Sequence, residues 1–309
     1  MEFQNNIPFI KPPRKFRGML IIEQDDGYMS ALDYWAPLLK SKKQISQWYP
    51  FIHDTPACLV ANSGFIGTSG RPTPEDLRTL QSDGWEIMNH GKYHAGLPAY
   101  HTTVAPVTGE STISVWIGSS MRTEYQYRLA TATGFEIVQP IDIGEADASN
   151  NSIITLDKPL IGPFGTTPSL LELTDEALDE EINGSLDLLL SWGLDVKHHV
   201  FPYHYWYSRT VNKVKERHLS SRLNNHLLTN ATPPPDWYSL SGRLDGTFSE
   251  DDIVSLIDTL YDEDSLGIFY GHDFNYGVGS RLDNLVTYAI KKGVRIVTRD
   301  QAYNLITNS

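Results

Sequence analysis

The sequence predicts an α/β fold in which repeated strand-then-helix units form a parallel sheet or a (β/α) barrel. The first observation is that short apolar runs, such as "GMLII" at residues 18–22, alternate with amphipathic segments of helical length. The second is that Asp or His follows several of these apolar runs. The third is a central block rich in Thr, Ile, Val and aromatic residues, with almost no helical period. We therefore expect a barrel domain at residues 1–100 and 168–309, interrupted by a β-rich insertion at residues 101–167.

The first hundred residues predict strands separated by helices. Each expected strand is a short apolar run, which is typical of strands buried on both faces of a sheet. In the second helix Thr73 is suited to the N-cap, Pro74 to the first helical position and Gly84 to the end. In chain order, we expect a strand at 17–23, a helix at 31–42, a strand at 57–62, a helix at 74–84 and a strand at 85–90.

After the β-rich block the alternation of helices and strands resumes. The helical period is clear in "TPSLLELTDEALDEEINGSLDLLLSWG", and "LGIFYGHD" is again an apolar run that ends in polar residues. In chain order, we expect a helix at 167–193, a strand at 195–203, a helix at 208–218, a strand at 238–246, a helix at 249–265, a strand at 266–273, and a helix, a strand and a helix within 280–306.

Composition excludes several classes of partner. The chain has 309 residues, a formal net charge of −13 and no basic stripe, which argues against nucleic acid or an anionic membrane as partner. We expect neither a membrane span nor a signal peptide, because no 18-residue apolar segment occurs. Cys58, the single cysteine, is expected to be a buried structural thiol. The sequence leaves localisation open, including action outside a cell or within a virion.

Asp25 and Asp26 lie side by side between an apolar run and a glycine, in "EQDDGYMS". Like charges held this close repel, so the pair needs water or a cation to stabilise it. An acid pair before glycine is more often a turn or a helix cap. By itself the pair leaves the choice open.

His90 and His94 are four residues apart in "NHGKYH" and would share one face of a helical turn. Two imidazoles and one carboxylate form an established ligand set for catalytic zinc, which leaves a coordination position for water. A histidine pair at this spacing also occurs on surfaces and in cores. Its combination with the acid pair at another strand end favours a metal site.

Four short motifs follow one another in the order found in a known family. They are "DDG" at residues 25–27, "HGKYH" at 90–94, "FPY" at 201–203 and "GIFYGH" at 267–272. With these motifs the chain resembles the polysaccharide deacetylases with a NodB-homology domain, carbohydrate esterase family 4, over residues 18–307 apart from the insertion. The resemblance implies a distorted (β/α) barrel.

The resemblance also implies roles for the residues of these motifs. Asp26, His90 and His94 would hold a divalent metal, with zinc the expected ion. Asp25 would be the general base, and His272 would protonate the leaving group. A cation on one carboxylate would then explain why the acid pair is tolerated.

The substrate-binding residues implied by the resemblance are Phe201, Pro202, Tyr203 and Arg243. Many family members carry an arginine that orients the base where this chain has Val200, and Arg243 is the candidate to replace it. Two further positions, Gly91 and Gln24, also depart from the family pattern, since Ser or Thr and an aromatic residue are common there.

The predicted function is removal of N- or O-acetyl groups from an acetylated polysaccharide or oligosaccharide by a metal-dependent hydrolase. An acetylated glycan is the expected partner. The alternatives are a glycan-binding or structural module of a virion or cell-surface assembly, and an amidase for small amides. The sequence leaves open the sugar, a homo-oligomeric state and assembly into a virion.

The role of the insertion is a separate question. It leaves the barrel after the motif that contains His90 and His94, so its base is expected to begin at the catalytic face. There it would cover the cleft, extend substrate contacts or mediate assembly. The alternative is a β-extension packed away from the site.

Overall fold

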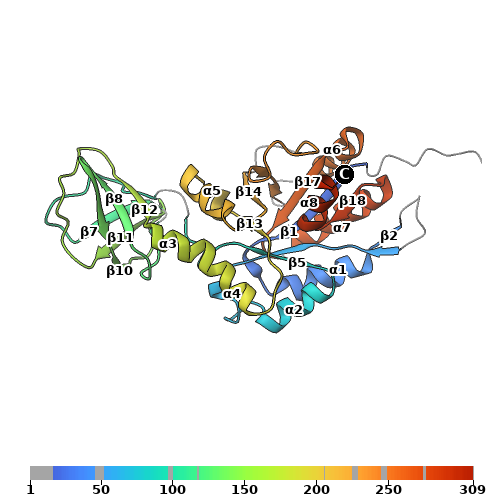
Figure 1. Ribbon diagram of the computed structural model, residues 1–309, viewed down its shortest axis with the longest axis horizontal. Coiled ribbons are helices and arrows are strands. Elements are labelled where there is room, and N and C mark those ends of the chain that lie inside the picture. The colour runs from blue at the N-terminus through green and yellow to red at the C-terminus, as the bar shows by residue number, and fades with distance from the viewer. Residues whose placement is uncertain are drawn as a thin grey trace, which may run out of the picture.

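A nearly closed parallel barrel and a smaller β-rich lobe make up the described part of this computed structural model (Figure 1). The described residues are 17–45, 52–96, 100–116, 118–204, 206–224, 229–244, 249–273 and 276–308. No helix among these residues is long and apolar enough to cross a membrane.

Nine parallel strands form the barrel sheet within the described residues, in the order β15-β14-β13-β5-β4-β1-β17-β16, with β18 paired to β1. Their bounds are β1 Met19–Gln24, β4 Cys58–Ala61, β5 Glu86–Asn89, β13 His198–Val200, β14 Ser220–Asn224, β15 Leu240–Ser241, β16 Arg243–Leu244, β17 Leu266–Gly271 and β18 Arg295–Val297. The predicted fold class, a distorted (β/α) barrel with a β-rich insertion, is confirmed by this topology. A two-stranded ladder, β2 (Lys43–Ile45) with β3 (Ile52–Asp54), lies outside the barrel sheet.

One short extended segment links the two edges of the barrel sheet. β15 pairs with β14, and β16, which begins two residues later, pairs with β17. Gly242 separates the two, because a Cβ there would lie 2.7 Å from Cδ of Arg222 and 3.0 Å from the ring of Tyr270. The expected single strand at 238–246 is therefore divided.

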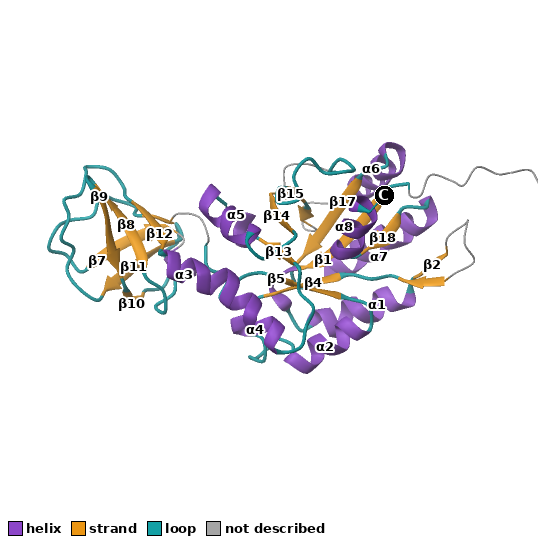
Figure 2. Ribbon diagram, viewed as in Figure 1, coloured by secondary structure: helices purple, strands orange, loops and turns teal. Residues whose placement is uncertain are grey.

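Helices surround the barrel sheet (Figure 2). Their bounds are α1 Ala36–Ser41, α2 Pro74–Ser82, α3 Asp175–Asp179, α4 Ser185–Ser191, α5 Ser208–Lys215, α6 Glu250–Glu263, α7 Tyr276–Lys292 and α8 Arg299–Thr307, with π-helical segments at Ala31–Trp35 and Glu180–Gly184. α2 begins as predicted, with Thr73 in a capping box and Pro74 in the first turn.

The barrel strands are buried on both faces, which explains their continuous apolar runs. Along β1, Met19 and Ile21 pack with Cys58 and residues of β17 in one core, whereas Leu20 and Ile22 pack with residues of α6 and α7 in another. Side chains alternate across a strand. Cys58 is buried, as expected.

The β-rich lobe contains two antiparallel sheets. One has the order β10-β11-β7 and the other β6-β12-β8-β9. Their bounds are β6 Tyr100–His101, β7 Thr112–Trp116, β8 Tyr127–Thr131, β9 Gly134–Val138, β10 Pro140–Ile143, β11 Asn151–Leu156 and β12 Leu170–Leu173. Their apolar core continues into Leu178 of α3 and Val211 and Val214 of α5, so the lobe packs on barrel helices.

One predicted helix starts later than expected. Residues 170–173, placed in the helix at 167–193, form β12, which pairs with β6 and β8. Burial alternates along this strand, which is the period of a half-buried strand rather than a helix. Thr174 then caps α3 by accepting from the Ala177 amide. The division of the chain at 101–167 stays a prediction.

Candidate active site

The barrel strands bring polar side chains to the end of the sheet at which their carboxyl ends meet. Asp25 follows β1, His90 follows β5 and His272 follows β17. Asp26 leaves β1 with a left-handed backbone, φ 69°, which Asp adopts more readily than most residues. This turn directs two adjacent carboxylates to different partners.

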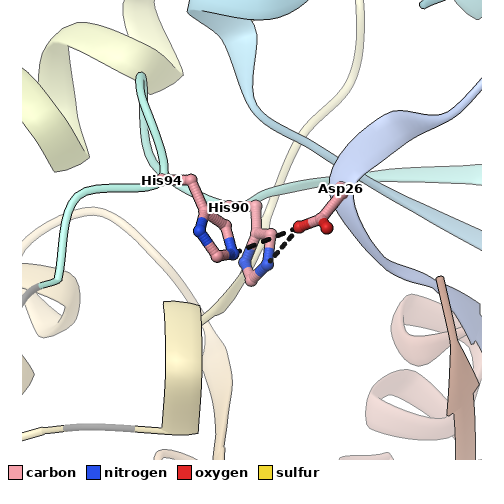
Figure 3. Close-up of side chains that lie close together, drawn as sticks. All are labelled: Asp26, His90 and His94. Carbon is pink, nitrogen blue, oxygen red and sulfur yellow. Dashed lines mark ion pairs between the residues drawn. The ribbon is translucent and has the colours of Figure 1, made fainter. Parts of the chain in front are cut away.

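Asp26, His90 and His94 converge on one point (Figure 3). Oδ1 of Asp26 lies 3.4 Å from Nε2 of His90 and 3.1 Å from Nε2 of His94. One potential ligand atom from each residue lies within 4.8 Å of the other two. The predicted trio is therefore brought together, with the carboxylate oxygen close to both imidazole nitrogens.

The hydrogen bonding of His90 fits a cation between these atoms. Nδ1 of His90 lies 2.8 Å from the carbonyl oxygen of Val200, which can only accept, so Nδ1 carries the proton. A neutral ring then presents the Nε2 lone pair to Oδ1 of Asp26, a buried oxygen with no hydrogen-bond partner among the described residues. Two lone pairs at this distance repel unless a cation stabilises them. The donor set, one carboxylate and two imidazoles, is one that zinc and similar divalent ions accept.

The pKa values of Asp26, His90 and His94 are shifted in different directions by burial and by the neighbouring charges. Burial raises the pKa of Asp26, but the adjacent His90 and His94 outweigh burial and hold it well below its ordinary value. For His90, burial lowers the pKa, and the carboxylates of Asp25 and Asp26 raise it above the ordinary value. For His94, burial and the neighbouring His90 prevail, and the pKa is lowered. Asp26 is thus an anion at neutral pH.

Asp25 is held by a buried arginine. Nη2 of Arg222 donates to Oδ1 of Asp25 at 2.7 Å, and Nε of the same side chain donates to Glu23 at 2.8 Å. Arg299 also donates to Glu23, so two arginines and two carboxylates form one buried network. Burial raises the pKa of Asp25, but Arg222 outweighs this effect and lowers it below the ordinary value. Asp25 is therefore ionised.

Arg222 lies beside position 200, where the family resemblance implied an arginine. It lies in β14 directly opposite Val200 in the parallel pairing with β13. Its guanidinium lies 3.9 Å from the centre of the Tyr270 ring, which fixes it further. The charge expected from β13 is thus supplied by the neighbouring strand. Arg243, the predicted replacement, is half-buried in β16 and does not line the cavity described next.

A cavity of about 500 Å³ opens at these residues. It is lined by Asp25, Asp26, Tyr28, Asn62, Phe65, Arg71, His90, His94, Arg122, Phe201, Tyr203, His204 and His272. Gln24 donates to the backbone carbonyl of His272 at 2.7 Å, which ties the loop after β17 to β1. Asp25 and His272 therefore share one space with the trio.

The predicted aromatic segment divides into buried and exposed parts. Phe201 is fully buried and lines the cavity, Pro202 is buried outside its lining, and Tyr203 is 40% exposed. The Tyr203 ring packs edge-on against His94 with centroids 4.5 Å apart. His204 also lines the cavity, and burial together with Arg222 lowers its pKa to about 3, so its ring is neutral.

The loop that carries His94 is anchored by Glu181, in the π-helical segment before α4. Its buried carboxylate accepts from the amides of Tyr93 and Ala95 and from the hydroxyl of Tyr125. Gly91 is required here, because its φ is +80° and a Cβ would lie 2.5 Å from Oε1 of Glu181. This contact gives a steric reason for glycine where the family pattern has Ser or Thr.

No protein-family model matches the sequence, and no curated protein sequence matches it. Solved structures of carbohydrate deacetylases resemble it in fold. One is the CE4 domain of a multidomain xylanase from the hindgut metagenome of Trinervitermes trinervoides, with 11% identity, a TM-score of 0.48, and coverage of 94% of this chain and 91% of that one. Another is the peptidoglycan deacetylase PdaC from Bacillus subtilis, with 13% identity, a TM-score of 0.48, and coverage of 94% and 93%.

A third is a family 4 carbohydrate esterase from Streptomyces lividans, with 10% identity, a TM-score of 0.43, and coverage of 92% of this chain and 91% of that one. At such identities the likeness concerns the fold alone.

Three arginines of the site are absent from the sequence prediction: Arg222, Arg71 and Arg122. The only sequence signal for Arg222 is a charged residue inside a short strand, "SSRLN". Arg71 and Arg122 lie in loops and carry no motif. Arg122 belongs to the β-rich block, so that block reaches the cavity and the alternative of an extension packed away from the site is wrong.

Proposed function

We propose that the chain is a metal-dependent hydrolase that removes N- or O-acetyl groups from an acetylated polysaccharide or oligosaccharide. The observation that carries the proposal is the convergence of Asp26, His90 and His94 beside an ionised carboxylate, Asp25, inside one cavity. The four motifs of the resemblance supply the same residues in the same order.

Asp26, His90 and His94 are the residues that would hold the metal, with zinc as the ion that best matches one carboxylate and two imidazoles. When bound, a divalent cation supplies a Lewis acid for the acetyl carbonyl and makes a neighbouring water more acidic. The chain contributes the orientation of its ligands, since Val200 holds the His90 ring and Glu181 holds the loop of His94.

Asp25 is the proposed general base. Arg222 keeps its carboxylate ionised and fixes its position by donating to it, while leaving the side chain at the cavity wall. The carboxylate accepts the proton of the attacking water as the carbon–oxygen bond to the acetyl carbonyl forms. Because its pKa is lowered, Asp25 is a weak base, so position rather than basicity is its main contribution.

His272 is the proposed general acid. It lines the same cavity as Asp25 but follows a different strand, β17. A protonated ring nitrogen of His272 would donate its proton to the leaving nitrogen or oxygen as the bond to the acetyl carbon breaks. The products are acetate and a free amine or hydroxyl.

Tyr203 is the proposed contact for a sugar ring, because it is exposed at the cavity and its ring is held against His94. Phe201 and Pro202, which precede it in the chain, are both buried. A direct substrate contact for Arg243 stays part of the proposal, with no support from the cavity lining.

Metal content and acetate release from a panel of acetylated glycans test the proposal together. We expect about one divalent ion per chain and acetate release that a chelator abolishes. Asp25→Asn keeps the size of the side chain but removes proton acceptance, so turnover should fall by roughly 10² or more while metal stays bound. The control is Asp142→Asn, the same change at an exposed position of β10.

Three other outcomes would replace the proposal. Release of acetate from small amides but from no glycan would indicate an amidase. Glycan binding without release would indicate a binding module. Unchanged turnover in Asp25→Asn would assign the base role to another group.

A further inference from the structure

The cavity contains two cationic side chains that the proposed chemistry does not use. Arg71 comes from the loop between β4 and α2, and Arg122 comes from the β-rich block. Both line the cavity together with the proposed metal ligands. A positive charge in a cavity of about 500 Å³ acts directly on whatever binds there.

Within the described residues, neither arginine is neutralised by a carboxylate. Arg71 donates to the backbone carbonyl of Asp26, and Arg122 donates to the backbone carbonyl of Tyr93 at 2.7 and 3.2 Å. In the described part of the chain, neither guanidinium lies within ion-pair distance of an acid, whereas those of Arg78, Arg209 and Arg217 do. A carbonyl oxygen satisfies N–H groups but leaves the net charge unchanged.

Both guanidinium groups are held by aromatic rings. The Arg71 guanidinium lies 3.8 Å from the centre of the Tyr28 ring. The Arg71 and Arg122 groups lie 5.9 and 5.4 Å from the same ring, that of Phe65. Two cations fixed beside one ring are preorganised, so little rotamer entropy remains to be lost when an anion binds.

The acids of the cavity cannot neutralise these cations. Asp25 is already ion-paired with Arg222, and Asp26 lies between two imidazoles. The charge that is left over in the cavity is therefore positive. This contrasts with the chain as a whole, which carries a formal net charge of −13.

We infer that the acetylated glycan carries carboxylate groups, and that Arg71 and Arg122 bind a carboxylate close to the acetyl group that is removed. This inference rests on the proposed function. Guanidinium groups match carboxylates with paired, charge-assisted hydrogen bonds. The negative charge of the distant surface does not prevent this contact, because charges beyond about 8 Å are largely screened at physiological ionic strength.

A pair of matched polymers tests the inference. Polygalacturonate and its carboxyl-reduced form, which is neutral, are acetylated to the same degree and offered to the metal-loaded protein. We expect kcat/KM for acetate release to be at least about 10-fold higher on the carboxylated polymer, since hydrogen bonds to a charged group are worth about that factor. Equal values on the two polymers would overturn the inference.

The ratio of kcat/KM between the two polymers tests whether the arginines bind the substrate carboxylate or only hold the site in shape. Arg122→Gln and Arg71→Gln should each reduce this ratio by about 10-fold, mainly through KM. If a variant acted only through loss of its contact with the Tyr93 or Asp26 carbonyl, kcat/KM would fall equally on both polymers. An unchanged ratio in both variants would overturn the inference. The control is Arg17→Gln, which removes the same charge at the opposite end of β1 and should leave the ratio unchanged.

A binding measurement on the unaltered protein tests the inference independently of how the variants fold. Titration calorimetry of the unaltered protein with unacetylated oligogalacturonate should show binding that weakens as salt is raised, and the carboxyl-reduced oligomer should bind at least about 10-fold more weakly. Equal binding of the two would overturn the inference. Acetate release from neutral glycans alone would overturn this inference and leave the proposed function intact, whereas no release from any glycan would overturn both.

Discussion

The barrel and the β-rich lobe differ in what they bury. The buried charged residues among the described positions, such as Glu23, Asp25, Arg222 and Arg299, belong to the barrel or to the helices that follow the lobe. The buried polar residues of the lobe, between Tyr100 and Leu173, are uncharged Thr and Ser. The comparison indicates that the barrel interior contains paired charges, whereas the lobe is stabilised by apolar packing.

The two regions also differ in what they leave exposed. Large apolar side chains of the lobe, such as Trp116, Phe135 and Ile153, are about half exposed, because its strands bury one face only. β1 and β17 of the barrel are buried throughout. The lobe contributes to the cavity through Arg122, and the proposed ligands, base and acid all follow barrel strands.

The largest expected effect is the loss of a proposed metal ligand from the barrel. His94→Ala should reduce acetate release by at least about 10³-fold, because a catalytic metal contributes several kcal/mol to the transition state. Bound metal, measured by mass spectrometry, should fall in parallel. His101→Ala, the same change at an exposed position of the lobe, should leave both values unchanged. Retention of metal and activity in His94→Ala would remove His94 from the ligand set.

The next effect concerns the buried charge network of the barrel. Arg222→Met leaves Asp25 without its partner in the interior and leaves Glu23 with Arg299 alone, and breaking such a buried pair typically costs about 3 kcal/mol or more. We expect the free energy of unfolding to fall by this amount in denaturant titrations. Arg128→Met in β8 of the lobe, which packs on Phe135 without an ion pair among the described residues, should cost much less. Similar losses in both variants would contradict the comparison.

A third prediction concerns the loss of folding stability at low pH. Burial lowers the pKa of His218 to about 4, and burial also lowers the pKa of His199. The unfolded chain therefore binds more protons than the folded one between pH 6.5 and about 4, so stability is full above this window and falls as pH decreases through it, by about 3 kcal/mol for His218. The only histidine of the lobe, His101, is exposed.

Denaturant titrations at several pH values, in the presence of a chelator, would measure this slope. His218→Gln should flatten the dependence, since it removes the proton-binding group. Hydrogen exchange would show which region unfolds first in acid. Unfolding that begins in the lobe would contradict the assignment of this pH dependence to the barrel histidines.

The smallest effect is expected where the two regions meet. Glu181→Gln keeps the shape of the side chain but weakens its hydrogen bonds from Tyr93, Ala95 and Tyr125. We expect a loss of about 1–2 kcal/mol in stability together with weaker metal binding, because the loop of His94 loosens. Glu176→Gln, at an exposed position of α3 with no ion pair among the described residues, should change neither. Loss of stability without any effect on metal affinity would limit Glu181 to a structural role.

Local chemistry made part of the site predictable. The order of strands and helices follows from the spacing of apolar residues along the chain. Caps such as Thr73 follow from the chemistry of the first helical turn. The acid pair and the two histidines could be brought together in the prediction because a parallel sheet gathers the ends of its strands, and the choice of Asp26 as the ligand came from the family resemblance. β12 was wrongly predicted as helix, because its pairing with β6 and β8 overrides the local pattern.

By itself the sequence determined the fold class and the residues at the strand ends, since both depend on short-range patterns. Only the tertiary structure decided which charges meet. Arg222 reaches Asp25 because of the register that places it opposite Val200, and Arg71 and Arg122 meet at Phe65 because the lobe folds back onto a barrel loop. Register and lobe packing depend on contacts between residues far apart in the chain, and no local period encodes them.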